Sequence, residues 1–465
     1  MAISSLKLKI ISHLGELIIA FSNWIWGTPL LLLLMGGGFF MLVYSGFIPF
    51  RGLRHAMKVV GGKYDDPNAK GDITSLQALS SAIAATVGLG NISGVALAIG
   101  TGGPGAIFWM WISAFVGMAT KFFTCTLAIM YRGKDSSGHV QGGPMYVIEE
   151  GMGKKWRFLS IIFCVAGIMG LLAIFQANQL TEVLRVVMLR PMGLDHGQST
   201  RWIIGITMML LVAIVILGGI QRIAKVASRL VPFMVTMYFL GVFVILYKNM
   251  GEIPEMLWYI IEDAFTGKAV LGGAVGQVII TGARRAAFSN EAGIGTAPMV
   301  HGASKTSEPV REGLIAMLGP FIDTIVVCTL TALVIMVTGV WKTGEQDGVL
   351  LTLSAFEKGL PGIGKYILVV AVLVFALSTM FTYSYYGHKC FNYLFGADKA
   401  NYYNYFYLIT IVVGAVTSLS VVMSFVDGMY AIMAFPTMIS AIYLSPKVIA
   451  ATKDYFRRMK TQDNQ

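Results

Sequence analysis

Long apolar stretches alternate with short polar loops along the whole chain. A membrane-spanning helix needs about 20 mostly apolar residues. Eleven stretches reach that length, at residues 20–47, 75–99, 105–131, 158–182, 201–219, 228–248, 269–297, 311–340, 363–388, 404–422 and 425–446. The pattern predicts an all-α integral membrane protein with about eleven transmembrane helices.

The spans also suggest a division of the chain. The first span, within 1–74, reads as an extra N-terminal helix followed by a cytoplasmic loop, and the other ten are numbered one to ten. Residues 75–250 and 251–446 then form two five-helix repeats of opposite orientation, and 447–465 form a basic cytoplasmic tail.

Composition supports a lipid environment. Hydrophobic residues make up 56% of the chain and charged residues 13%, whereas an ordinary soluble domain is about 25% charged. The net charge of +11 does not indicate nucleic-acid binding, because the basic residues lie in short loops between apolar runs.

The placement of Lys and Arg predicts the orientation. With the N-terminus outside, segments on the inside carry 24 basic residues and segments on the outside carry 10. Basic loops stay on the cytoplasmic side. We therefore expect a multi-pass protein of the plasma (inner) membrane with its N-terminus outside and its C-terminus in the cytoplasm.

Glycines interrupt helix one. Gly88, Gly90 and Asn91 fall in the middle of this span. Glycine costs about 1 kcal/mol in a helix interior, so the sequence favours a break there. Carbonyls at the end of one half-helix can ligate a cation, and N–H groups at the start of the next can hold a carboxylate. Close packing of helices at small residues is the alternative interpretation.

Helix six is interrupted in a similar way. It contains Gly272 and Gly273, and its apolar run stops at Gly282 before Arg284 and Arg285. It follows helix one by five helices, an odd offset that inverts its direction. Two interrupted segments at matching positions of inverted halves are typical of transporters, so we expect helices one and six to be broken.

Polar groups within the apolar spans are the remaining candidates. Ser378 and Thr379 in helix eight offer hydroxyl ligands for Na⁺, or they bond to carbonyls of their own helix. Lys121 in helix two, Asp323 in helix seven and Glu291 after helix six are charges that serve an ion path or a structural pair. Glu291 is a possible partner for Lys121, which alternatively extends to the inner interface.

Several motifs resemble those of the alanine/glycine:cation symporter family, which has the inverted-repeat fold of the leucine transporter and belongs to the amino acid-polyamine-organocation superfamily. The resemblance covers nearly the whole chain from about Leu76. The matching stretches are residues 88–96, 102–111, 117–122, 142–146, 288–295 and 322–324.

The resemblance implies a set of site residues. It places Na⁺ between the carbonyls of Ala84 and Val87 in helix one and three groups of helix eight. These are the carbonyl of Phe375 and the hydroxyls of Ser378 and Thr379. It assigns the substrate carboxylate to Gly90 and Asn91, and the pocket walls to Gln176, Ile280, Thr281 and Gly282, with Gly88, Thr379 and Tyr383 beside them.

The chain departs from the family pattern at two places. It has Thr382 and Tyr383 where the family usually has Gly-Trp, which puts the exact substrate in doubt. It has Thr124 where the family usually has Glu, which removes the obvious partner of Lys121.

The expected function is Na⁺-coupled import of a small neutral amino acid, alanine or glycine, by alternating access. On helices one, three, six and eight no charge lies near the expected pocket before Arg284, and a charged substrate would be stranded there. Another neutral amino acid such as glutamine or serine, and coupling to protons, remain alternatives. An ion channel is a remoter one, because no filter-like repeat is present. An enzyme is not expected, because the six histidines lie near helix ends or in loops without a spaced carboxylate or cysteine.

Overall fold

The structure is a bundle of helices. This computed structural model describes residues 2–64, 71–266, 274–344 and 347–463. Within them the strands are β1 (Gly133–Lys134) and β2 (Val140–Gln141), an antiparallel hairpin in which Gly133 pairs with Gln141. The predicted all-α fold is confirmed.

Seven of the described helical spans are long and apolar enough to cross a membrane. They are α8 (Gly105–Met130); Lys154–Leu189, which contains α10 (Arg157–Gly170), α11 (Ile174–Leu184) and η5 (Arg185–Leu189); α12 (Gln198–Ile216); α13 (Gly219–Lys248); Pro309–Val337, which contains α17 (Pro309–Ala316), α18 (Leu318–Pro320), η7 (Phe321–Cys328) and α19 (Thr329–Val337); α21 (Gly364–Phe395); and α23 (Leu419–Asp463).

Two further spans are bent helix pairs. In the first, α1 (Ala2–Ile25) meets α2 (Thr28–Leu31), η1 (Leu32–Gly36) and α3 (Gly37–Tyr44) at 50°. The span expected at 20–47 is therefore bent, and its first helix begins before residue 20. Pro29 stands in the first turn of α2, where a proline favours the start of a new helix because it donates no backbone hydrogen bond.

The second bent pair is helix one. Here α6 (Ser75–Thr86) is followed by η2 (Gly90–Gly94) and α7 (Val95–Gly102), and the two halves meet at 48°. Helix six is also interrupted, between α15 (Ala274–Asn290) and α16 (Ala297–His301). Its helix runs unbroken through Gly282, and the interruption lies at residues 291–296. Gly272 and Gly273 lie outside the described residues.

The remaining expected spans are shorter than predicted. The helix α15 has 17 residues and falls within the expected span 269–297, of which residues 269–273 are not described. The helix α22 (Asn401–Val416) has 16 residues and overlaps the expected span 404–422.

Three of the longer helical segments lie where loops or a tail were expected. They are α14 (Ile253–Thr266), α20 (Gly348–Gly359) and the last part of α23, which continues through the expected tail to Asp463. The helix α20 is too short to span a membrane. The end of α23 is supported by pairs of Arg457 and Arg458 with Asp454, three and four residues apart.

Short helices join these elements: α4 (Ile48–Arg51), α5 (Leu53–Val60), α9 (Pro144–Tyr146), η3 (Val147–Met152), η4 (Lys154–Trp156), η6 (Met250–Glu252), η8 (Val340–Lys342) and η9 (Ala397–Lys399).

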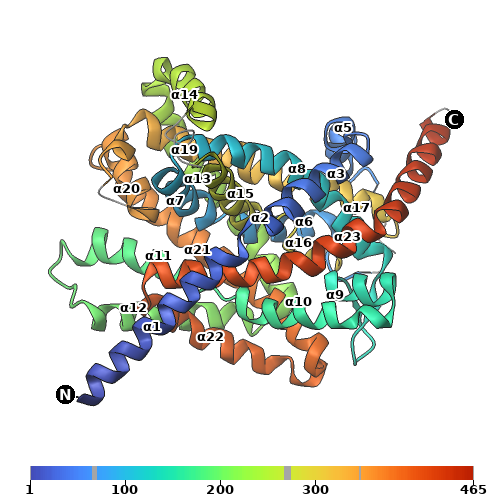
Figure 1. The fold of residues 1–465 in the computed structure, drawn as a ribbon, viewed down its shortest axis with the longest axis horizontal. Helices are drawn as coiled ribbons and strands as arrows, with labels where there is room; N and C mark the ends of the chain where they lie inside the picture. Colours follow the sequence, from blue (N-terminus) through green and yellow to red (C-terminus); the bar gives the residue numbers. More distant parts are fainter. Residues whose placement is uncertain (1, 65–70, 267–273, 345–346, 464–465) are drawn as a thin grey trace.

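The arrangement gives the bundle two ends (Figure 1). The helix α20 and the α11–α12 connection lie at one end, and α9, α5 and the C-terminus lie at the other. We refer to them as the α20 end and the α9 end. The N-terminal helix α1 packs along α23, and the two termini lie at opposite ends of the molecule (Figure 1).

Candidate functional site

The break in helix one is held open by the side chain of Asn91. Val87, after the end of α6, has an extended backbone with φ −72° and ψ 92°. The Asn91 Oδ1 accepts a hydrogen bond from the Gly88 N–H at 2.8 Å, and its Nδ2 donates to the Asp323 carboxylate at 2.7 Å. The asparagine thus replaces a lost helical acceptor and ties the break to η7.

Four of the residues expected to bind the ion lie together beside this break. The hydroxyls of Ser378 and Thr379 on α21 each lie 3.3 Å from the carbonyl oxygen of Ala84 in α6. Both also donate to the Phe375 carbonyl, at 2.9 and 3.1 Å. All four residues are buried. Neutral hydroxyl and carbonyl oxygens are the kind of ligands that hard cations prefer. Val87 is also buried.

The glycines of the break allow close approach of other helices. A Cβ on Gly88 would lie 2.6 Å from Thr379 Oγ1, and a Cβ on Gly90 would lie 3.2 Å from Ser289 Cα. Gly88 therefore faces the residues of α21 that are expected to bind the ion, and Gly90 faces the end of α15. A side chain at either position would push helices apart.

A buried carboxylate lies at the interruption of helix six. Glu291 has φ +55°, in the left-handed region that non-glycine residues rarely adopt. Its carboxylate accepts from the hydroxyls of Tyr383, Tyr430 and Thr296, the last at 2.5 Å. The hydroxyl of Tyr383, an expected substrate residue that departs from the family pattern, is thus bonded to Glu291.

Asp323 is the second buried carboxylate near the break. Besides Asn91 it accepts from Ser289 Oγ at 2.7 Å and Thr324 Oγ1 at 2.8 Å. The expectation of no charge near the pocket before Arg284 is therefore incomplete, because these two carboxylates contact the expected substrate residues Asn91 and Tyr383. Asp323 lies on helix seven, which was not among those four helices, and Glu291 lies in the interruption of helix six, after Arg284.

Lys121 is buried in α8 without a direct ion pair. Among the described residues no carboxylate oxygen lies within 4.0 Å of its Nζ, which points toward Gly319. Thr124, at the position where the family usually has Glu, bonds to the Thr120 carbonyl of its own helix at 2.9 Å. The possible direct pair with Glu291 is not formed.

Gln176 offers an unused acceptor near the middle of the bundle. It is 4% exposed, and its Oε1 has no hydrogen-bond partner among the described residues. The neighbouring Phe175 ring meets Phe288 edge to face at 4.9 Å, and Phe288 is also close to Gly90. A buried acceptor without a partner carries a free-energy cost that a ligand N–H would remove.

The expected wall residues of α15 lie elsewhere. A Cβ on Gly282 would meet the Ala106 carbonyl, and Thr281 packs against Gly102. Ile280 and Thr281 line a cavity of about 540 Å³ toward the α20 end, together with Arg284, Arg285 and Asp427. They precede Phe288 by seven or eight residues, or about 11 Å along the helix. The residues of α15 that approach Gly90 are Phe288 and Ser289, which belong to the 288–295 motif.

The two arginines that line this cavity change the count of basic residues in the inside loops. Arg284 and Arg285 were counted among the inside loops, but they belong to α15 and pair with Asp427 of α23, Arg284 at 2.7 Å. Arg284 also donates to Ser22 and Asn23 of α1. Removing both arginines from the 24 inside residues leaves 22, so the bias retains its sign.

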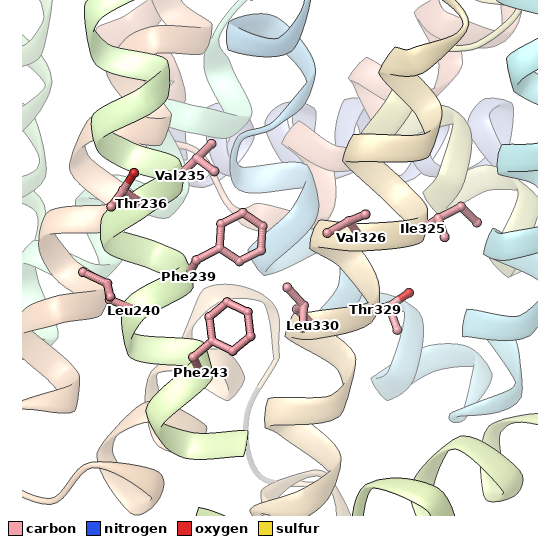
Figure 2. Close-up of a pocket in the computed structure, with 9 residues that line it drawn as sticks. All are labelled: Val235, Thr236, Phe239, Leu240, Phe243, Ile325, Val326, Thr329 and Leu330. Carbon is pink, nitrogen blue, oxygen red and sulfur yellow. The ribbon is translucent and has the colours of Figure 1, made fainter. Parts of the chain in front are cut away.

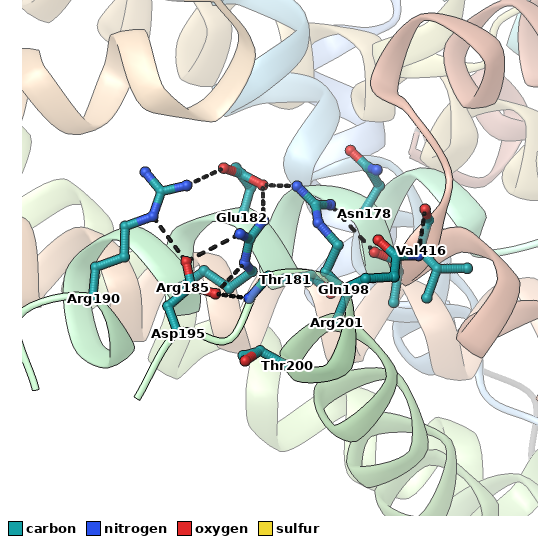
Figure 3. A network of polar contacts seen from close by, with 12 residues as sticks. Asn178, Thr181, Glu182, Arg185, Arg190, Asp195, Gln198, Thr200, Arg201 and Val416 are labelled. Atoms are coloured by element: carbon teal, nitrogen blue, oxygen red, sulfur yellow. Dashed lines mark hydrogen bonds and ion pairs between the residues drawn. The ribbon is translucent and has the colours of Figure 1, made fainter. Parts of the chain in front are cut away.

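A charged network closes the α20 end beside α11 (Figure 3). Asp195 accepts from Arg185 at 3.0 Å and from Arg190 at 2.9 Å, and these guanidiniums hold the pKa of its carboxyl well below the usual range. Glu182 accepts from Arg201 at 2.6 Å. One turn before Glu182, Gln179 accepts from Ser93 of η2 at 2.6 Å and from the Val349 N–H of α20 at 3.0 Å. Hydrogen bonds thus connect α11 to the broken helix and to α20.

A second polar cluster closes the α9 end. Glu312 of α17 accepts from His301 Nδ1 at 2.6 Å, from Ser304 at 2.9 Å and from Ser75 at 3.0 Å. His301 therefore does have a carboxylate partner, contrary to the expectation from sequence. The cluster joins the start of α6 to α16 and α17, at the ends of both interrupted helices that lie toward the α9 end.

An apolar groove of about 640 Å³ lies apart from these polar groups (Figure 2). It runs between α13 and the η7–α19 segment. Leu240 and Phe243, two of its lining residues, are exposed on the bundle surface, 62% and 61%. Among the described residues that line it, two threonine hydroxyls are the polar side-chain groups. It cannot pair the charges of an amino acid, and its apolar rim suits contact with lipid.

Interrupted helices that meet buried hydroxyl and carbonyl oxygens are typical of membrane transporters, and this bundle has the leucine-transporter fold. The solved structure of MhsT in complex with L-phenylalanine has this fold; it matches with a TM-score of 0.57 and 13% identity, covering 82% of this chain and 98% of its own.

The chain belongs to the sodium:alanine symporter family, whose model matches residues 11–465. The sodium/alanine symporter AgcS of Methanococcus maripaludis is 39% identical, over 93% of this chain and 95% of its own. The probable sodium/glutamine symporter GlnT of Bacillus subtilis is 32% identical, over 94% and 90%. The protein is therefore an amino-acid symporter of the membrane and not an enzyme.

Proposed function

We propose that this protein imports a small neutral amino acid, of the alanine or glycine class, together with Na⁺ by alternating access. The observation that carries the proposal is the meeting of the Ser378 and Thr379 hydroxyls with the Ala84 carbonyl, directly before the break in helix one. A sodium ion between these oxygens ties α6 to α21.

The substrate binds at the break as a zwitterion. Its carboxylate faces the first N–H groups of the half-helix Gly90–Gly102. Its ammonium group faces the amide oxygen of Gln176, which has no protein partner among the described residues. Na⁺ and substrate each stabilise the same closed arrangement of the break. Each therefore raises the affinity for the other, by a coupling free energy of typically about 1–3 kcal/mol.

Alternating access follows from the two polar closures. Residues 75–250 and 251–446 act as inverted repeats that rock about the site. The α20 end faces the outside and the α9 end faces the cytoplasm, in the inner (plasma) membrane, because the basic loops gather at the α9 end. The N-terminus is then outside and the C-terminus inside.

A test replaces the two hydroxyls while keeping side-chain shape. The double variant Ser378→Ala with Thr379→Val should lose Na⁺-stimulated alanine uptake into proteoliposomes. Thr382→Val is the matched control, because the Thr382 hydroxyl bonds only to the Ser378 carbonyl of its own helix, at 3.1 Å. Normal uptake by the double variant in a Na⁺ gradient refutes the ion site.

Glutamine is a second candidate substrate. The departure from the family pattern at Tyr383 favours glutamine, because the Tyr383 hydroxyl contacts Glu291 and so changes the polar groups beside the expected pocket. The relative GlnT is a second reason. Uptake of labelled alanine, glycine, serine and glutamine, each driven by a Na⁺ or an H⁺ gradient, separates these substrates and the two ions.

A further inference from the structure

A cavity at the α9 end contains two polar groups that keep unused hydrogen-bonding capacity among the described residues. It has a volume of about 330 Å³ and lies between the β1–β2 hairpin, α21 and the start of α22. Tyr385, His388, Lys389 and Asn392 line it from one face of α21, because residues three and four apart share a helix face. None of these residues belongs to the ion or substrate site described above.

Lys389 supplies a buried cation to this cavity. It is 4% exposed, and its Nζ donates to the Met299 carbonyl at 2.8 Å and the Gly142 carbonyl at 3.2 Å. An ammonium group has three hydrogens to donate; no described oxygen or nitrogen accepts the third, and the Nζ lies over the ring of Tyr385, 5.1 Å from the ring centroid. No described carboxylate lies within 4.0 Å of the Nζ either. The cation therefore has capacity for an anion.

Asn392 supplies an acceptor next to it. The residue is 9% exposed, its Nδ2 donates to the Asp135 carboxylate at 3.3 Å, and its Oδ1 has no partner among the described residues. The contact with a carboxylate identifies the nitrogen, because an amide oxygen facing Asp135 would be repelled. The unpaired atom is thus an oxygen, which accepts N–H donors.

These two groups match the two ends of an amino acid. We propose that the cavity is a second binding site, a transit site that takes a neutral amino acid as a zwitterion, with its carboxylate on Lys389 Nζ and its ammonium on Asn392 Oδ1. Ile216, Leu217 and Ile223 form an apolar wall for a small uncharged side chain. The volume lies at the lower end of the usual range for ligand sites, about 300–1,000 Å³.

The position suits release of substrate. Lys389 follows Thr379 by ten residues of the continuous helix α21, which is about 15 Å, in the direction of the α9 end. This inference rests on the proposed function, in which the α9 end faces the cytoplasm. A substrate that leaves the break exchanges its contacts there for those of Lys389 and Asn392 before it reaches water.

The test is binding stoichiometry. Purified protein with saturating Na⁺ is dialysed against labelled L-alanine up to concentrations far above the transport KM. The wild type should bind two alanines per chain, the second more weakly. Lys389→Met and Asn392→Leu should each bind one. Lys399→Met, a matched change at an exposed lysine outside the cavity, should bind two. Alaninamide, which has no carboxylate, should not displace the second alanine.

Several results overturn the proposal. The proposal is wrong if the wild type binds one alanine per chain. It is also wrong if Asn392→Leu still binds two alanines per chain. The Asn392 variant decides the matter if Lys389→Met fails to fold, since Asn392 donates a single hydrogen bond. Wild type that binds no alanine at all refutes the proposed substrate instead, which separates the two failures.

Discussion

Adding one methyl group at Gly88 tests the ion site most directly. A Cβ at this position would lie 2.6 Å from Thr379 Oγ1 and 3.8 Å from the Phe375 carbonyl. Carbon and oxygen do not approach so closely without a bond, so one of them must move. Thr379 is 1% exposed and its hydroxyl is bonded to two carbonyls, which leaves it little room to turn away.

The expected size of the effect follows from overpacking. An extra methyl group in a well-packed interior typically costs about 1–3 kcal/mol. Since Na⁺ is proposed to bind where α6 and α21 meet, this cost falls on the ion-bound arrangement. It corresponds to a Na⁺ affinity roughly 5- to 150-fold weaker. The Na⁺ concentration that gives half-maximal uptake should rise by that factor in Gly88→Ala, with smaller effects on expression and folding.

Gly100→Ala is the matched control. It lies in the second half of the same broken helix, and a Cβ there would meet nothing within 4 Å. Its uptake should be unchanged, because alanine is preferred to glycine within a helix. Proteoliposome uptake of labelled alanine over a range of Na⁺ concentrations gives both values. If Gly88→Ala keeps the Na⁺ dependence of the wild type within a factor of two, Thr379 is not an ion ligand that abuts this glycine.

Three further outcomes are expected. Gly90→Val should lose amino-acid binding in calorimetry at saturating Na⁺, because its Cβ would lie 3.2 Å from the backbone of Ser289; unchanged affinity would move the substrate site elsewhere. In intact cells a cysteine at Gly193 should react with an impermeant thiol reagent and one at Ser137 should not, against a low background since the four native cysteines are buried; the reverse pattern inverts the topology. Asp195→Asn should lower the Tm at neutral pH, and the Tm difference from wild type should narrow below about pH 4. The folded pKa of Asp195 is depressed. The contribution of its ionised carboxylate to stability is therefore present above the unfolded pKa of about 3.9 and is lost as the pH falls through the folded pKa. A constant difference down to acid pH contradicts this account.

Local sequence was enough to locate most of the helices. Each of the eleven apolar stretches contains helix in the described part of the chain, because lipid requires every backbone group of a spanning segment to be bonded within the segment. The sequence was less informative about short amphipathic segments. The helix α20 was missed because twelve residues lack a spanning signal, and it is stabilised by contacts such as Thr352 with the Ile92 carbonyl at 3.1 Å.

The position of a break depended on partners far away in the chain. Glycines marked the interruption of helix one, where Gly88 and Gly90 flank it. In helix six the same reasoning pointed to Gly282, yet this glycine allows α15 to pack against the Ala106 carbonyl and stays within the helix. The interruption comes at Glu291 instead, because its carboxylate accepts hydrogen bonds from three hydroxyls, on α21, on α23 and at residue 296.

The sequence by itself determined that this chain spans the membrane as helices and that the span at 75–99 is broken, and it showed which hydroxyl side chains lie within the apolar spans. Those properties depend on apolar length, glycine and side-chain chemistry within a few residues. Only the tertiary structure decided that Asn91 reaches Asp323, that Glu291 lies among hydroxyls and that Lys389 and Asn392 share a cavity. These contacts join residues that in most cases lie dozens to hundreds of positions apart, and packing of whole helices brings them together.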